Sequence, residues 1–288
     1  MQNNHPRFSG LATRLSAGIA VLGALVFISV LTANYWLSRD LLENYVGELA
    51  RTAAASTVNR IEAVFSSVAT SADALAAIVV KADISEEQIQ DSIRAFMKIN
   101  PDLYGMTVAL EPEVLHPNIG EFSPYYFRQG NDLSYTDLAD EDYRYRLWDW
   151  YQLPRAANDS VWTEPYFDRG GGNTLITTYA TPLSIGNAPR FAGVATADIA
   201  LDWLQRLVEE IQILETGFGL IVSQQDTIVA HPDASRVMKT LKSTLDADFI
   251  DNYWDIYLQS KQAHQAAYFN APCRHIEGDC WIAIKPLL

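Results

Sequence analysis

Cysteine is scarce in this sequence. The only two cysteines, Cys273 and Cys280, stand six residues apart around a Gly-containing segment. In an oxidising compartment a pair this close predicts a hairpin disulfide, which would stabilise the fold by roughly 2 to 3 kcal/mol. The alternative is a metal site made of Cys273, His275, Asp279 and Cys280, but ligands on one turn rarely complete a tetrahedron. We expect the disulfide and no metal.

Signatures of catalysis are missing as well. The sequence has no HExxH, no GxSxG, no Walker loop and no GxGxxG, and each of these carries a specific chemistry. The run Gly170-Gly171-Gly172 lacks a following Lys-Ser or Lys-Thr, so it predicts a hairpin turn rather than a phosphate loop. The five histidines are dispersed. We therefore expect no catalytic residues and no cofactor in this region.

Basic residues are too few to support binding to a polyanion. All 35 acids lie at or beyond Asp40, whereas three of the 21 basic residues precede it, which leaves a net charge of −17 from residue 40 onward. A field of this sign disfavours nucleic acid and anionic lipid as partners. The roughly 250 residues of this part are enough for one large or two small domains.

Charge is absent altogether from residues 15–37, a run of 23 residues. At about 1.5 Å per residue a helix of this length covers roughly 35 Å and can cross a bilayer. A cleaved signal peptide is the alternative, but it needs an apolar stretch of about 7 to 15 residues and a small-x-small site, and Leu31-Thr32-Ala33 is a poor one. We expect an uncleaved transmembrane helix.

The flanks of this helix predict its orientation. Arg7 and Arg14 precede it without any acid, whereas Asp40 and Glu43 follow it. The positive-inside rule then places residues 1–14 in the cytoplasm and residues 38–288 outside the plasma (inner) membrane.

The remainder has an α+β pattern. No proline and apolar residues at helical spacing predict one long helix over residues 38–81. Ser85 and Gln88 form a capping box that begins a second helix, which stops before Asn100-Pro101. Segments rich in Val, Ile, Thr and Tyr then predict an antiparallel sheet. Two further helices are expected at 201–213 and 246–261. The expected strands are 103–110, 125–128, 175–182 and 192–199, followed by a second, smaller set at 219–222, 227–230, 267–269 and 281–285.

The order of these elements indicates two similar modules on one long helix. Residues 143–198 are also rich in aromatic side chains with a few charges among them, including Arg146, Asp168 and Asp198. Aromatic walls with placed charges are typical of a small-molecule pocket. Trp and Tyr bury large areas in an ordinary core too, so both interpretations stay open at this point.

Several short motifs resemble the double Cache (dCache) sensor domains of bacterial transmembrane receptors. Together they cover nearly all of residues 38–288 in order. The motifs are Asp149-Trp150-Tyr151, Trp-Thr-Glu-Pro-Tyr-Phe-Asp at 162–168, Thr-Thr-Tyr-Ala-Thr-Pro at 177–182, Gly-Val-Ala-Thr-Ala-Asp-Ile at 193–199 and Asp-Thr-Ile-Val-Ala-His-Pro-Asp at 226–233.

The resemblance implies a membrane helix that continues into a long signalling helix spanning two PAS-like modules. The expected divisions are 1–14 cytoplasmic tail, 15–37 transmembrane helix, 38–81 signalling helix, 82–205 membrane-distal module and 206–288 membrane-proximal module. The last module stops in mid-strand at 281–288, which indicates truncation before a second transmembrane helix. We also expect a homodimer through the long N-terminal helices.

The resemblance further implies a ligand site in the distal module. By position, Trp150 and Tyr151 match a Trp-Tyr pair on the pocket wall, and Asp198 matches an acid that pairs with a ligand ammonium. Amino-acid-binding members have Arg two residues before that Trp, where this chain has Trp148. An α-carboxylate then loses its best partner, whereas a cation held by Asp198 and aromatic faces is favoured. The candidate ligand residues are Arg146, Trp148, Trp150, Tyr151, Tyr166, Asp168, Tyr179 and Asp198.

The expected function is that of an extracytoplasmic sensor for an amine, amino acid or carboxylate. Related sensors are joined to histidine kinases, chemotaxis transducers, cyclic-dinucleotide enzymes or serine/threonine phosphatases, and residues 162–172 resemble the phosphatase-linked members to a small degree. Two alternatives are a membrane-anchored adhesion module without signalling and an anchored hydrolase that uses Asp168 and Asp198. The hydrolase requires an acid and a base with separated pKa values.

Overall fold

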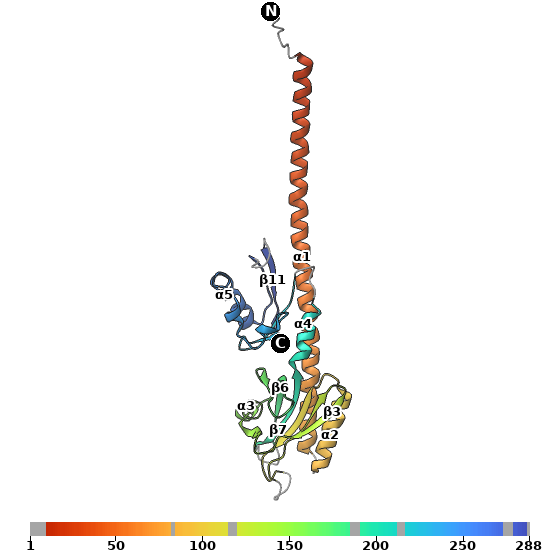
Figure 1. Ribbon diagram of the computed structural model, residues 1–288, viewed down its shortest axis with the longest axis vertical. Helices are drawn as coiled ribbons and strands as arrows, with labels where there is room; N and C mark the ends of the chain where they lie inside the picture. Colours follow the sequence, from red (N-terminus) through yellow and green to blue (C-terminus); the bar gives the residue numbers. More distant parts are fainter. Residues whose placement is uncertain are drawn as a thin grey trace, which may run out of the picture.

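One very long helix organises the molecule. The structure is a computed structural model, which describes residues 10–81, 84–114, 120–184, 191–211, 217–272 and 279–286. Helix α1 (Leu11–Lys81) has 71 residues, so it extends over roughly 107 Å. Its C-terminal half carries two folded modules, while its N-terminal half stands free of them (Figure 1). The predicted continuity of the apolar helix with the helix that follows is confirmed.

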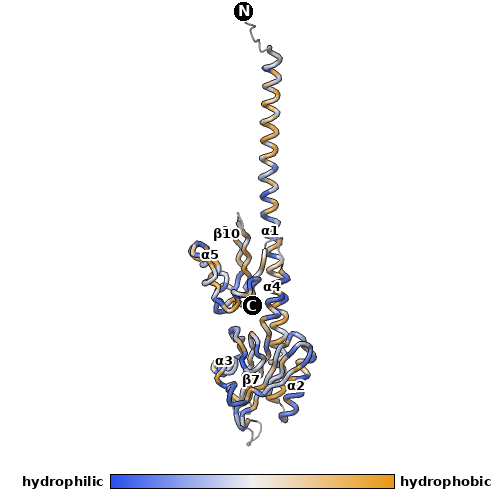
Figure 2. Tube along the Cα trace, viewed as in Figure 1, coloured by the Kyte–Doolittle hydropathy of each residue, from blue (hydrophilic) through white to orange (hydrophobic). Residues whose placement is uncertain are grey.

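The free half of α1 is apolar. Large side chains such as Leu22, Phe27 and Trp36 are exposed there, and Figure 2 shows this part of the tube mostly in the hydrophobic colour. Within the described residues, α1 is the one helix long and apolar enough to cross a membrane. Apolar side chains left in water would be unfavourable, and a bilayer removes that cost.

A seven-stranded antiparallel sheet forms the larger module, which lies farthest from the N-terminus (Figure 1). Its strand order is β3-β2-β1-β7-β6-β4, and β5 pairs with β6. We call this the distal module. Its strands are β1 (Gly105–Leu110), β2 (Pro124–Gln129), β3 (Asp132–Asp137), β4 (Val161–Trp162), β5 (Tyr166–Phe167), β6 (Leu175–Ser184) and β7 (Phe191–Ala200).

The central strands of the distal module are buried on both faces. On one face, α1 and α2 (Glu86–Ile99) form a core in which Leu75 and Ile93 contact side chains such as Val108 of β1. On the other face, the short 3-10 helix η1 (Tyr145–Leu147) and α3 (Asp149–Ala157) bring an aromatic cluster against the sheet. The seven strands therefore separate an aliphatic layer from an aromatic one.

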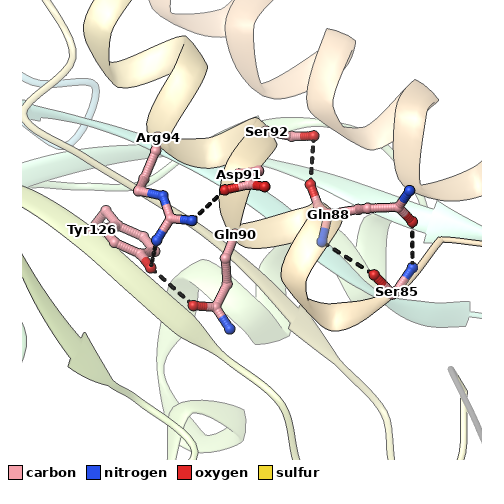
Figure 3. A network of polar contacts seen from close by, with 7 residues as sticks. All are labelled: Ser85, Gln88, Gln90, Asp91, Ser92, Arg94 and Tyr126. Carbon is pink, nitrogen blue, oxygen red and sulfur yellow. Dashed lines mark hydrogen bonds and ion pairs between the residues drawn. The ribbon is translucent and has the colours of Figure 1, made fainter.

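Helix α2 is fixed by the capping box predicted from the sequence. Ser85 Oγ accepts a hydrogen bond from Gln88 N, and Gln88 Oε1 accepts one from Ser85 N (Figure 3). On the same helix, Arg94 donates a hydrogen bond to the Tyr126 hydroxyl at 3.0 Å, and that hydroxyl donates to Gln90 Oε1 at 2.9 Å (Figure 3). These bonds join α2 to strand β2.

The smaller module, which we call the proximal module, follows helix α4 (Leu201–Glu209) and lies beside the middle of α1 (Figure 1). Helix α4 ends four residues before the predicted Ile213. The remaining elements are the strands β8 (Ile221–Val222) and β9 (Ile228–Ala230), the 3-10 helices η2 (Ala234–Arg236) and η3 (Leu241–Thr244), α5 (Ala247–Ala263), and the strands β10 (Ala267–Pro272) and β11 (Asp279–Ile284).

The described strands of the proximal module are arranged differently from those of the distal module. Within the described residues they form two separate pairs, β8-β9 and β10-β11. The second edge of β9 is already occupied, because Ile228 N donates to Lys239 O and Met238 N donates to Ile228 O. The segment after η2 therefore takes the place that another strand would need.

The β10-β11 hairpin joins the proximal module to α1. The ring of Trp281 approaches Gly47 so closely that a Cβ there would lie 3.4 Å from it, and the guanidinium of Arg51 lies 4.6 Å from the centre of the Tyr268 ring. Cys280 in β11 is disulfide-bonded. Cys273 and His275 lie outside the described residues, and so do the predicted Cys273–Cys280 pairing and the alternative metal site that depend on them.

Gly193 is a position where strand pairing requires glycine. Its φ is +147°, and a Cβ added there would lie 2.1 Å from the carbonyl oxygen of Ala109 in β1. We predict that Gly193→Ala lowers the free energy of unfolding by about 2 to 4 kcal/mol, because the methyl group pushes β7 from β1. Thermal unfolding of the chain in detergent measures this. Gly120→Ala is the matched control, since its Cβ would meet nothing within 4 Å; equal unfolding temperatures for the two variants would contradict the prediction.

Candidate functional site

A polar floor lies on the aromatic side of the distal sheet. Neighbouring side chains of a strand point to opposite faces, so Ala195 and Ala197 of β7 face the helices, while Thr196 and Asp198 face the aromatic cluster. Thr107 of β1 and Thr178 of β6 lie beside them, because Thr107 pairs with Thr196 and Thr178 pairs with Asp198 in the strand register. Four polar side chains therefore meet at the centre of a buried sheet.

Asp198 is the most constrained of these groups. Its side chain is 3% exposed, and its Oδ1 accepts a hydrogen bond from Thr178 Oγ1 at 2.7 Å. Burial raises the pKa of Asp198 to about 7, an effect that the Thr178 hydrogen bond opposes and the nearby Asp168 strengthens. Asp198 therefore places a carboxyl group in an environment that solvates its ionised form poorly.

Asp168 reaches the same place from the β5-β6 hairpin. The glycine run turns this hairpin as predicted, and Gly172 N donates a hydrogen bond to Asp168 Oδ2 at 2.7 Å. The Tyr143 hydroxyl donates to Asp168 Oδ1 at 2.5 Å. A Cβ at Gly171 would lie 2.1 Å from Asp168 Oδ2, so glycine is required there. Burial raises the pKa of Asp168, while the hydrogen bonds from Tyr143 and Gly172 lower it.

The two carboxylates line a small cavity of about 10 Å3, which is about the space of one water molecule. The hydroxyl of Tyr125 is buried at this cavity, where it interacts with Asp198 but makes no hydrogen bond of good geometry to a described residue. None of the described residues lining it is Lys or Arg. The lining consists of Thr107, Tyr125, Leu138, Tyr143, Trp150, Tyr166, Asp168, Thr178, Thr196 and Asp198.

A larger groove of about 480 Å3 lies next to this inner cavity. The two spaces share three aromatic residues, Tyr143, Trp150 and Tyr166. In the groove, Trp148 stacks on Tyr143 with 5.0 Å between the ring centres, and its Nε1 donates to the Tyr143 carbonyl oxygen at 3.0 Å. The other lining residues are Asp142, Arg144, Leu147, Asp149, Glu164 and Pro165. Aromatic rings therefore separate the open groove from the buried carboxylates.

Five of the eight candidate ligand residues meet around these two spaces. Asp168 and Asp198 line the inner cavity, Trp148 lines the groove, and Trp150 and Tyr166 line both. Ligand contact by these residues stays a prediction.

Arg146 is placed elsewhere. It forms ion pairs with Glu111 and Glu121, with N to O distances of 3.2 and 3.3 Å, and it lines neither the cavity nor the groove. Tyr151 also points toward Glu111, because its hydroxyl donates to Glu111 Oε1 at 2.8 Å. The acids at the end of β1 therefore hold both residues away from Asp198.

Tyr179 lies on the opposite face of the sheet. It follows Thr178 in β6, and its hydroxyl donates to Asp73 Oδ2 of α1 at 3.4 Å. The strand alternation that directs Thr178 to the cavity directs Tyr179 to the helix. We therefore leave Arg146, Tyr151 and Tyr179 out of the ligand site proposed below.

The sequence analysis did not select Thr107, Tyr125, Thr178 or Thr196 as site residues. The signal for Thr107 and Thr196 was present, since each is a polar residue in a largely apolar strand, whereas Thr178 follows Thr177 in β6 and carried no such signal. Tyr125 carried no comparable signal, because its role depends on the hydrogen bonding of its hydroxyl in the fold.

Comparisons with known proteins identify the distal module. Residues 89–206 match the methyl-accepting chemotaxis protein-like first PDC sensor domain. The methyl-accepting chemotaxis protein PscA of Pseudomonas syringae pv. tomato is 36% identical over 100 residues, which is 35% of this chain and 15% of PscA. PctB of Pseudomonas aeruginosa is 29% identical over 130 residues, which is 43% of this chain and 20% of PctB. The chain thus matches only a small part of the length of these receptors.

Solved structures show the same fold at low sequence identity. The extracellular domain of the putative histidine kinase mmHK1S-Z3 superposes with a TM-score of 0.68 at 20% identity, covering 86% of this chain and 90% of that domain. The ligand-binding domain of the Pseudomonas aeruginosa amino acid chemoreceptor PctB, in complex with L-Gln, superposes with a TM-score of 0.53 at 18% identity, covering 81% of this chain and 80% of that one.

The family match falls on the module that holds the polar cavity, and the structural likeness covers 86% of the chain. Residues 89–206 therefore form a methyl-accepting chemotaxis protein-like first PDC sensor module, and the chain has the fold of the extracellular sensor domains to which it is similar.

Proposed function

We propose that this domain is the extracytoplasmic input of a transmembrane receptor and that its ligand is a small molecule carrying an ammonium group. The observation that carries this proposal is the pair of buried carboxylates, Asp168 and Asp198, at a cavity without a Lys or Arg among its described lining residues. A buried carboxylate is costly unless it is paired, and a bound cation supplies the missing partner.

The neighbouring groups suit an ammonium ion. An –NH3+ group has three donors and no acceptor, and Asp198, Asp168 and the Tyr125 hydroxyl offer oxygen atoms around one small space. The rings of Tyr143, Trp150 and Tyr166 present faces that attract a cation. Two related receptor structures are described as complexes with L-Gln and with GABA, and both compounds contain an amino group.

The small size of the inner cavity means that binding requires a second arrangement of the aromatic residues. A cavity the size of one water cannot hold an organic amine, so the rings that line both spaces, those of Tyr143, Trp150 and Tyr166, must move to enlarge it. A ligand that binds the open arrangement more tightly shifts the population toward it.

Strand β6 offers a route from this site to the membrane helix. On one face of β6, Thr178 holds Asp198. On the other face, Thr181 Oγ1 donates to Asp73 Oδ1 of α1 at 2.6 Å. A ligand that alters the Thr178–Asp198 hydrogen bond therefore acts on a strand that is tied to α1.

We place residues 1–14 in the cytoplasm and residues 15–37 of α1 in the inner membrane, and we propose a homodimer through α1, where Leu41, Leu42 and Tyr45 stay exposed just beyond the apolar run. The matched relatives are chemotaxis receptors, and we propose the same kind of output for the full receptor. A hydrolase would require an acid and a base with separated pKa values, and burial raises the pKa of both Asp168 and Asp198.

Asp198→Asn tests the site directly. We predict that n-butylamine, 4-aminobutanoate and 1,4-diaminobutane raise the unfolding temperature of the wild-type chain in detergent, by about 5 °C at saturation, and that each shift falls below about 1 °C in the variant, because the amide has no charge to pair with the ammonium. Asp132→Asn, at the exposed edge strand β3, is the control and keeps the full shift. Unchanged shifts in Asp198→Asn, or no shift for any of the three compounds in the wild type, would refute the proposal.

Binding is also expected to depend on pH. The pKa of Asp198 is about 7, so its ionised fraction falls from about 90% at pH 8 to about 10% at pH 6. An alkylammonium ion with a pKa near 10 stays charged over this range. We predict that the Kd for n-butylamine, measured by calorimetry, is about tenfold weaker at pH 6 than at pH 8. An affinity that is constant or stronger at pH 6 would show that Asp198 is not the group that pairs with the cation.

A further inference from the structure

The outer groove is acidic as well. Its lining contains Asp142, Asp149 and Glu164 but only one basic residue, Arg144. Together with Asp168 and Asp198 of the inner cavity, five carboxyl groups stand against one guanidinium. A ligand with a single positive charge would leave these two adjoining spaces negative.

Glu164 is the best-defined of the outer acids. It lies between β4 and β5, and its Oε1 accepts a hydrogen bond from the backbone N–H of Gln225 in the proximal module at 3.1 Å. Its Oε2 is buried and has no hydrogen-bond partner among the described residues. Asp142 and Asp149 are exposed instead, so water and salt screen them. Glu164 therefore presents a fixed oxygen atom that lacks a donor.

The inner cavity also holds a buried oxygen without a well-formed hydrogen bond. Tyr125 is 2% exposed, and its hydroxyl interacts with the Asp198 carboxylate but makes no hydrogen bond of good geometry to a described residue. Between Glu164 and the inner carboxylates, Tyr143, Trp150 and Tyr166 line both spaces. The site thus has a buried oxygen without a well-formed hydrogen bond in each of its two spaces and an aromatic wall common to both.

We propose that this site takes an organic dication of the α,ω-diamine class. One ammonium pairs with Asp198 in the inner cavity, the second pairs with Glu164 in the groove, and the methylene chain packs against the shared aromatic rings. This inference rests on the proposed function, since it requires the first ammonium at Asp198. Because Glu164 also holds Gln225, the second ammonium acts at a contact between the two modules.

A competing ligand class follows from Arg144. Its guanidinium lines the groove, and a guanidinium favours a carboxylate. An ω-amino acid with its ammonium at Asp198 would then bind better than a diamine. Arg144 is exposed, whereas Glu164 is partly buried and anchored, and on this difference we favour the diamine.

Calorimetric titration of the full chain in detergent separates these classes with three four-carbon probes: 1,4-diaminobutane, n-butylamine and 4-aminobutanoate. We expect 1,4-diaminobutane to bind about tenfold more tightly than n-butylamine, and 4-aminobutanoate to bind more weakly than both. In Glu164→Gln, whose amide oxygen still accepts from Gln225 N, the advantage of the diamine falls below about twofold, while n-butylamine affinity is unchanged. Glu141→Gln, an exposed acid beside the groove that does not line it, keeps the advantage.

The outcomes distinguish this inference from the function on which it rests. If n-butylamine binds and Asp198→Asn abolishes its binding, the sensor assignment stands. The second subsite is then wrong if the diamine binds no more tightly than n-butylamine, or if it keeps its advantage in Glu164→Gln. Tighter binding of 4-aminobutanoate than of the diamine would assign the groove to Arg144 and likewise overturn the inference. If none of the three probes binds the wild-type chain, both proposals fail.

Discussion

The burial of the Asp198 carboxylate at the centre of an antiparallel sheet is the constraint on which the distal module depends. Its strand, β7, is buried along almost its whole length, so the charge cannot reach water by a change of rotamer. Thr178 supplies one hydrogen bond, and Asp168 adds a second carboxyl group nearby instead of a cation. Stability alone would favour an apolar residue at this position. The arrangement therefore supports the proposal of a ligand that carries the opposite charge.

The same strand pairing explains how a small site can act on a long helix. A β-strand presents alternate residues to two faces, and β6 has Thr178 on the face of Asp198 and Thr181 on the face of α1. No separate relay is required, because one rigid strand makes both contacts. The proximal module has its own link to the helix through Trp281 and Gly47. The distal and proximal modules thus contact α1 at two separate places, and a movement of the helix changes both contacts.

Much of this fold was readable from local sequence patterns. The apolar run, the capping box at Ser85 and the long strands β6 and β7 each carry a signal that lies within the segment itself. Strand β3 and helix α3 lacked such a signal: β3 is a largely exposed edge strand, and α3 contains Pro154. The arrangement of the proximal module depended on contacts distant in sequence, since the edge of β9 is occupied by Lys239 and Met238, and no periodicity within β9 predicts this.

The site was harder to predict because neighbouring residues of a strand lie on opposite faces of the sheet. Tyr179 belonged to a motif that resembles the family, yet its neighbour Thr178 is the residue at the cavity. Arg146 was selected for its charge, but Glu111 and Glu121 pair with it at the end of β1, and these pairs join segments distant in sequence. The glycine run, which predicted only a turn, also shapes the candidate site. Gly171 leaves room for the Asp168 carboxylate, and Gly172 N donates a hydrogen bond to it. A residue type chosen for a turn therefore also fixes the second acid beside Asp198.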